Sequence, residues 1–282
     1  MKSLGAFVFT LLLCLPLVSA ARADEPDTST RLTLALRQAT LVQSMRASTC
    51  FAMGGIDQDR QGALALEHAD SYGTTLAALR DGHDWLGLSP ARNADDVAAV
   101  ATAETVWRDF RPAVDQIIAG DLHSVVMRQI MRDADPTVDS ATRLSGHFFD
   151  TLDMPASGPH IRQAAQLAAH YRMLTQRALG EMCFVLFDLG GAPMRSRLLE
   201  TLSDIDQSFA LLSEGGTDIA PPPSARVSRN LRTAHLFWSK MRPTIVAVQS
   251  DTMPDALTVQ KMLKLNKSVL KQLDQAVDGY IG

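Results

Sequence analysis

The sequence predicts an all-α protein that consists of two tandem antiparallel four-helix-bundle-like repeats, about eight helices in all. Three observations lead to this fold class. Apolar residues recur at helical spacing along most of the chain, and no segment persuasively alternates apolar and polar residues over the length of a strand. Clusters of glycine and proline divide the chain into segments of helical length. The two halves also match each other at a nearly constant offset, which indicates an internal duplication.

The first half contains four expected helices, over residues 30–53, 57–79, 94–119 and 122–152. The breaks between them fall at Gly54-Gly55, Gly82 and Gly120, because glycine readily ends a helix. The fourth helix should bend or break at Asp135-Pro136, since proline removes a backbone hydrogen bond.

The second half contains four more, over residues 160–189, 193–213, 224–249 and 254–281. Its breaks fall at Gly190-Gly191, Gly215-Gly216 and Pro221-Pro-Pro223. Four helices joined by short to medium loops are typical of an antiparallel four-helix bundle. Each half is therefore expected to form one bundle.

The duplication is clearest in the first and third helices of each half. Leu41, Gln43 and Cys50-Phe51 recur 133 residues later as Leu174, Gln176 and Cys183-Phe184. After a loop the offset becomes 131, where Trp107-Arg-Asp-Phe-Arg-Pro112 corresponds to Trp238-Ser-Lys-Met-Arg-Pro243. Tryptophan occurs only three times in the chain, so this match is specific. The repeated proline should kink both third helices at the same place.

The beginning of the chain has the features of an export signal. Lys2 is followed by an apolar stretch from Gly5 to Val18, and Ala21-Arg22-Ala23 provides a small-x-small cleavage sequence. An anchoring helix is the alternative, but the apolar run is shorter than the roughly 20 residues that a membrane span needs. We therefore expect a signal peptide over 1–23, a first transducer-type repeat over 24–153, a linker over 154–159 and a second repeat over 160–282.

Composition excludes several classes of protein. Without the expected signal peptide, 259 residues remain, with 25 basic and 31 acidic side chains and a net charge of about −6. Such an acidic chain lacks the basic surface that nucleic acid requires. The two remaining cysteines are too few for a disulfide-dense scaffold or a four-cysteine zinc site. No later segment is long and apolar enough to span a membrane, so we expect a protein of the periplasm or an equivalent exported space.

Sequence motifs for catalysis are missing. The chain has no Gly-rich phosphate loop, no His-Glu-x-x-His and no Gly-x-Ser-x-Gly. Its seven histidines include no i, i+4 pair of the kind that binds a metal on a helix. We therefore expect a protein that is not an enzyme and that has no cofactor and no metal.

The second repeat opens with a distinctive segment, Ala168-Ala-His-Tyr-Arg-Met-Leu-Thr-Gln-Arg177, on a helix that continues with apolar residues. The segment resembles the signature of the type IV pilus methyl-accepting chemotaxis transducer N-terminal domain. Periplasmic sensor domains of nitrate/nitrite sensor histidine kinases share this signature. The resemblance covers both repeats and is sharpest from Arg172 to Arg177. It implies a four-helix bundle in a sensory protein.

The resemblance also implies a ligand site. In the nitrate sensors, two subunits place the motif's first arginine around one small anion. That arginine corresponds to Arg172, and Thr175, Gln176 and Arg177 complete the motif. The first repeat departs from the pattern, because Ala39 stands at the position of Arg172 and only the glutamine, Gln43, is retained. An arginine pair formed by the two repeats is thus not reproduced.

Helical geometry suggests a substitute for the missing arginine. Arg46 lies one turn beyond Gln43, on the stripe equivalent to that of Arg172 and Gln176. If the two first helices face each other, Arg172 and Arg46 would line their seam, with Gln43 and Gln176 as neutral donors. A guanidinium matches the spacing of two oxygens in a planar oxyanion. The alternative is that these arginines lie on the surface or form structural ion pairs.

Cys50 and Cys183 occupy the same stripe at equivalent positions. Disulfides persist in exported proteins, and face-to-face packing would bring the two Cα atoms within the roughly 4.4–6.8 Å that a disulfide spans. Two buried free thiols are the alternative. Both alternatives stay open, as does a redox-responsive role for the pair.

The leading hypothesis is a soluble periplasmic sensory or ligand-binding protein that binds a small anion, nitrate or nitrite, between the first helices of its repeats. The chain ends at Tyr280-Ile-Gly282 without a signalling module, so its partner would be a membrane-bound sensor kinase or chemotaxis receptor. The alternative is a non-enzymatic interaction or scaffold protein that has lost the ligand site.

Overall fold

The computed structural model describes residues 25–151, 158–250 and 253–282, and it confirms the all-α fold. The helices are α1 (Glu25–Met53), α2 (Gln58–Asp81), α3 (Ala94–Ile118), α4 (Ser124–Thr151), α5 (Pro159–Leu186), α6 (Gly191–Glu214), α7 (Ala225–Ala247) and α8 (Ala256–Ile281). A short 3-10 helix, η1 (Asp84–Leu86), lies between α2 and α3. The expected signal peptide (1–23) and most of the expected linker lie outside the described residues.

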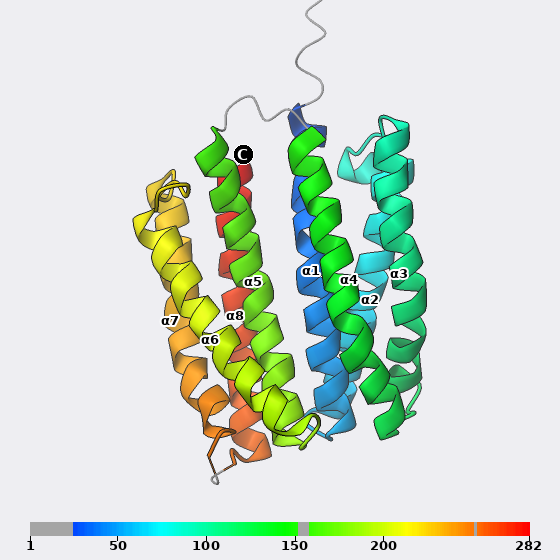
Figure 1. Ribbon diagram of the computed structural model, residues 1–282, viewed down its shortest axis with the longest axis vertical. Helices are drawn as coiled ribbons and strands as arrows, with labels where there is room; N and C mark the ends of the chain where they lie inside the picture. Colours follow the sequence, from blue (N-terminus) through cyan, green and yellow to red (C-terminus); the bar gives the residue numbers. More distant parts are fainter. Residues whose placement is uncertain (1–24, 152–157, 251–252) are drawn as a thin grey trace, which may run out of the picture.

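The helices form two four-helix bundles that lie side by side (Figure 1). In the first bundle, α1 and α3 each pack against both α2 and α4. In the second, α5 and α7 each pack against both α6 and α8. The bundles meet mainly through α1 and α5, which occupy the centre of the molecule (Figure 1). None of the helices in the described ranges combines the length and apolar character that a membrane crossing requires.

The helix boundaries follow local signals in the sequence. Side chains of Asn93, Ser224 and Asp255 accept hydrogen bonds from backbone N–H groups in the first turns of α3, α7 and α8, as N-cap residues do. The helix α5 ends three residues before the expected end, because Asp188 and Gly190 adopt left-handed conformations with φ of 53° and 105°.

Of the expected bend or break at Asp135-Pro136, the break is wrong, because α4 runs continuously from Ser124 to Thr151. Pro112 and Pro243 likewise lie inside continuous helices, α3 and α7. Around Pro136, the neighbours Ala134 and Thr137 are fully buried. The Thr137 hydroxyl also donates to the Asp133 carbonyl, over 2.7 Å. Packing on both sides of the proline therefore outweighs the hydrogen bond that proline removes.

A pseudo-twofold axis runs along α1 and α5, which point in the same direction (Figure 1). Residues separated by the repeat offset of 133 touch each other at successive turns. Cys50 and Cys183 are bonded, with their Cα atoms 6.1 Å apart. One turn further on, a Cβ added to Gly54 would overlap the ring of Phe187. A residue contacts its own repeat equivalent only near a symmetry axis, so this axis follows the α1–α5 contact.

The two central helices are buried almost all round. Every residue from Thr40 to Ala52 of α1 is buried, and so is every residue of α5 from Tyr171 to Val185 except Arg177. A helix with this burial forms the core of a protein. Polar side chains on these segments must therefore find partners inside the molecule.

Candidate functional site at the seam between the repeats

The contact of α1 with α5 is here called the seam, and it has two sides. On one, the α4 side, α4 and the start of α6 lie beside it; on the other, the α8 side, α2 and α8 lie beside it. The pseudo-twofold axis exchanges the two sides. Buried positions of α4 and α8 match at an offset of 132, as in Met127 with Val259 and Phe148 with Tyr280. The two sides can therefore be compared residue by residue.

Arg172 lies on the α8 side and is buried. Its Nε donates to the Thr40 hydroxyl over 3.2 Å, and its Nη2 donates to the Leu36 carbonyl over 3.0 Å. Its Nη1 donates to the carboxylate of Asp274 on α8. Burial lowers the pKa of Arg172 against the opposing effect of Asp274. All three guanidinium nitrogens thus have protein partners, and Arg172 ties α5 to both α1 and α8.

The next motif residues also bond within the protein. Gln176 and Asn266 of α8 exchange two hydrogen bonds between their amides, of 2.8 and 3.0 Å. Ser44 of α1 donates to the Gln176 amide oxygen over 3.4 Å. Thr175 donates to the Arg172 carbonyl over 2.7 Å. The bond from Ser44 joins the two repeats, and the Gln176–Asn266 pair joins α5 to α8.

Arg46 lies on the α4 side, in a cluster of charged groups. Its Nη1 lies 3.6 Å from an Asp135 oxygen on α4, and it donates to the Gln43 amide oxygen over 3.3 Å. Its guanidinium also lies 4.7 Å from the ring centre of Phe184. Burial lowers the pKa of Arg46 to about 10, so the group stays charged at neutral pH. The structure thus places Arg46 and Arg172 at the same seam with different partner helices.

Three further groups complete the Arg46 cluster, which we define as Arg46, Asp135, Arg177, Glu181 and Arg197. Arg177 donates to Glu181 over 2.9 Å. Arg197 of α6 donates to Asp135 over 2.7 Å and lies 3.7 Å from Glu181. Burial opposes the ionisation of Asp135, but Arg46 and Arg197 outweigh burial and lower its pKa. Three guanidinium groups therefore face two carboxylates, which leaves one positive charge in excess.

Several buried polar atoms at this cluster lack a hydrogen-bond partner. They are Nε and Nη2 of Arg46, Nε2 of Gln43 and Oε2 of Glu181. The side chains of Arg46 and Glu181 are fully inaccessible to solvent. An unpartnered buried donor costs about 1–3 kcal/mol, and a charged one costs more. These atoms are thus the ones at the seam that have most to gain from a polar ligand.

Charges and open spaces alternate around the axis. Arg172 and Asp274 correspond to Ala39 and Thr142, which line a cleft of about 700 Å³ on the α4 side. Members of the Arg46 cluster correspond to residues that line a cavity of about 200 Å³ on the α8 side; these are Ser44, Ser48, Leu64, Leu179 and Lys267. We call these spaces the Ala39 cleft and the Gln176 cavity. Where one side of the seam has a cluster of charged side chains, the position related to it by the pseudo-twofold axis on the other side has an open space.

The acidic partners of the arginines were not among the ligand-site residues predicted from the sequence, which are Gln43, Arg46, Arg172, Thr175, Gln176 and Arg177. Glu181 follows Arg177 by four residues, a spacing that favours a helical ion pair and could have identified it. Asp135, Arg197 and Asp274 come from other helices and carry no local signal. No group of three or more His, Cys, Asp or Glu side chains suited to a metal ion occurs within the described ranges.

Comparison of the chain with protein-family models, with curated proteins and with solved structures found no match. The fold and the seam define its class. It is an all-α protein of two four-helix bundles that share a buried, charged contact along a pseudo-twofold axis.

Proposed function

We propose that this chain is a sensory or ligand-binding protein of the exported space that binds a small planar oxyanion, nitrate or nitrite, between α1 and α5. It would pass the bound state to a membrane-bound sensor kinase or chemotaxis receptor. One observation carries the proposal: Nε and Nη2 of Arg46 are buried without a hydrogen-bond partner, and so is Nε2 of Gln43, whose amide oxygen accepts from Arg46 Nη1. The resemblance of Arg172 to Arg177 to the transducer signature supports the same function.

The chemistry of Arg46 suits such a ligand. Nε and Nη2 form one side of the guanidinium, where two parallel N–H groups match two oxygens of a planar anion. The Gln43 amide would supply a neutral third donor. The excess positive charge of the Arg46 cluster favours an anion over a cation, and burial strengthens charge-assisted hydrogen bonds. Arg177, about 30% exposed, lies where the cluster meets solvent.

Binding at this place offers a route to a signal. The anion would compete with Asp135 and Glu181 for the guanidinium groups of the cluster. The guanidinium groups belong to α1, α5 and α6, and Asp135 belongs to α4, so both bundles would respond. A ligand shifts such an equilibrium only by binding one packing of the helices better than another. Arg172 and Gln176 would hold the α8 side of the seam while the α4 side changes.

Thermal unfolding in a panel of anions tests the proposal. At constant ionic strength, nitrate or nitrite should raise the Tm in a dose-dependent way, whereas chloride and sulfate should raise it less. Arg46→Lys keeps the charge but removes the paired donors, and Gln43→Leu removes the neutral donor. Both variants should lose most of the response. A nitrate response that is unchanged in Arg46→Lys would refute a site at Arg46.

The matched control is Arg172→Lys. Because the protein itself satisfies the Arg172 donors, this variant should be less stable without anion and should keep the nitrate response. A response that is lost in Arg172→Lys and kept in Arg46→Lys would move the site to the α8 side, where the family resemblance alone would place it.

The second candidate function is an interaction or scaffold protein without a ligand. The complete pairing of Arg172 with Thr40, Leu36 and Asp274 favours it. Such a protein would capture the same membrane partner with and without nitrate. A pull-down from membrane fractions in both conditions separates the two functions, because a sensor's partner binding should change with the anion.

A further inference from the structure

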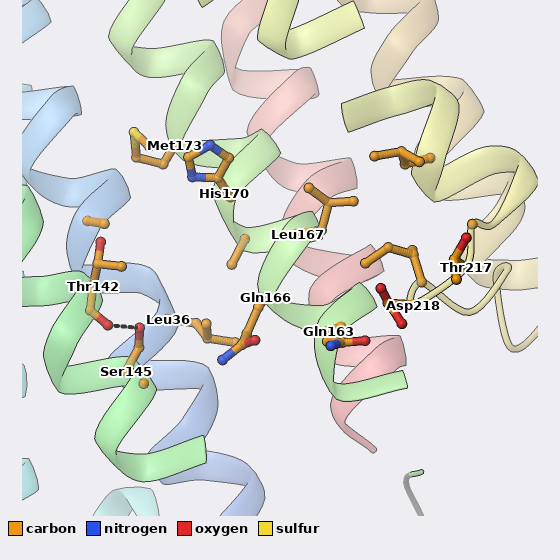
Figure 2. Close-up of a pocket in the computed structure, with 16 residues that line it drawn as sticks. Leu36, Thr142, Ser145, Gln163, Gln166, Leu167, His170, Met173, Thr217 and Asp218 are labelled. Carbon is orange, nitrogen blue, oxygen red and sulfur yellow. Dashed lines mark hydrogen bonds between the residues drawn. The ribbon is translucent and has the colours of Figure 1, made fainter. Parts of the chain in front are cut away.

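The Ala39 cleft differs in chemistry from the rest of the seam. Its floor consists of the buried residues Leu36, Ala169 and Met173, with the half-buried Ala39 among them. Polar groups stand around its rim: Thr142 and Ser145 on α4, Gln163, Gln166 and His170 on α5, and Thr217 and Asp218 after α6. Figure 2 shows the α4 residues and the Thr217-Asp218 segment on opposite sides, with the α5 side chains between them.

The cleft lies at the position where the other side of the seam has an ion pair. On the α8 side, Arg172 and Asp274 fill the corresponding place. On the α4 side, Ala39 and Thr142 are too short to do so, and Gly146 adds no side chain. A Cβ at Gly146 would have no neighbouring atom within 4 Å. The volume, about 700 Å³, is in the range of small-molecule sites, about 300–1,000 Å³.

The lining indicates what kind of molecule would fit. Asp218 is the only Asp, Glu, Lys or Arg among the described residues of the lining. Desolvation lowers the pKa of His170, so its imidazole is neutral at neutral pH. The cleft therefore has no cation to pair with an anionic ligand. It offers an apolar floor together with amide, hydroxyl and imidazole groups for hydrogen bonds.

We propose that the Ala39 cleft is a second binding site, which takes an uncharged small molecule with an apolar body and at least one hydrogen-bonding group. The molecule would touch α1 and α4 of the first repeat and α5 of the second, so it would bridge the two bundles. This site is separate from the Arg46 cluster, and the proposal does not depend on anion binding.

The probe for the test is N-phenyl-1-naphthylamine, an uncharged aromatic amine whose fluorescence rises in apolar surroundings. Titration into the folded protein should give saturable binding of one molecule per chain. Its anionic relative 8-anilinonaphthalene-1-sulfonate has a similar aromatic body. Its dissociation constant should be at least about tenfold higher than that of the uncharged probe. Equal or tighter binding of the sulfonate would overturn the proposed ligand class.

Gly146→Leu fills the cleft from the α4 wall and should weaken binding of the uncharged probe by about tenfold or more. Gly62→Leu in α2 is the matched control. A Cβ at Gly62 also meets no atom within 4 Å, and Gly62 lies outside the cleft. Ala39→Met should weaken binding by filling the cleft from its floor. The proposal is overturned if the wild type shows no saturable binding, or if the folded Gly146→Leu and Ala39→Met variants bind as well as Gly62→Leu.

Discussion

Arg172 and Arg46 show how similar residues on equivalent helix stripes acquire different roles. Arg172 has a protein acceptor for each guanidinium nitrogen. Arg46 is buried as deeply, yet two of its nitrogens have none. The helical spacing of the two arginines in the sequence predicts that both lie at the seam. It does not distinguish them, because the difference lies in Asp274 and Asp135, which are about 90–100 residues away in sequence and are brought close only by tertiary packing.

Replacement of Arg172 should be costly to stability. Arg172→Ala removes three hydrogen bonds, one of them to a carboxylate, and opens a hole beside α1. We expect the free energy of unfolding to fall by about 2–4 kcal/mol, less than for a fully buried pair, because Asp274 is partly exposed to solvent. Urea denaturation measures the change. The exposed Arg128 is the control, and Arg128→Ala should change stability by no more than about 0.5 kcal/mol. A loss below about 1 kcal/mol for Arg172→Ala would contradict the role of Arg172 in tying α5 to α1 and α8.

His68 should make stability depend on pH. It lines the Gln176 cavity, and burial lowers its pKa to about 4. The unfolded chain, with an ordinary histidine pKa near 6.5, binds the proton more readily, so stability falls as the pH drops from about 7 to 4. We expect His68 to account for about 2–3 kcal/mol of that loss. Urea denaturation at several pH values measures it, and His68→Gln should flatten the curve. Identical curves would contradict the shift.

At the scale of single elements, the sequence predicted eight helices and the structure confirms them. Local signals sufficed for this, since glycines and N-cap side chains mark the ends. The expected break at Pro136 was wrong because tertiary packing, and not a local signal, decides the structure there. Ala134 and Thr137 are buried, and α4 continues past a residue that would end an isolated helix. The intrinsic helix propensity of a residue contains no information about such tertiary packing.

The disulfide between α1 and α5 should stabilise the molecule as a cross-link. It joins residues 133 positions apart, and a bond that closes a long loop restricts the unfolded chain. The double variant Cys50→Ser, Cys183→Ser should keep its helical content and lose about 2–4 kcal/mol of unfolding free energy. Reductant should destabilise the wild type and leave the double variant unchanged. If reductant has no effect on the wild type, the cross-link does not contribute.

At the scale of the whole molecule, the duplication builds a pseudo-dimer in one chain, and its two sides have diverged. The matches at Gln43, Cys50 and Trp107 predicted the two repeats from sequence. The alternation of ionic clusters with the Ala39 cleft and the Gln176 cavity was not foreseen. Ala39 in place of Arg172 was visible in the sequence. Only the structure shows that Thr142 also stands in place of Asp274 and that no other side chain of the described residues fills the space.

Hydrogen–deuterium exchange with and without nitrate tests the central claim, that the seam binds a small oxyanion at Arg46, most directly. We expect slower exchange at saturating nitrate in peptides that cover residues 40–50 of α1 and 173–186 of α5, with a smaller effect around Asp135. The same peptides in Arg46→Lys should not respond. Unchanged exchange in wild-type protein at saturating nitrate, or protection confined to helices away from the seam, would contradict anion binding at Arg46.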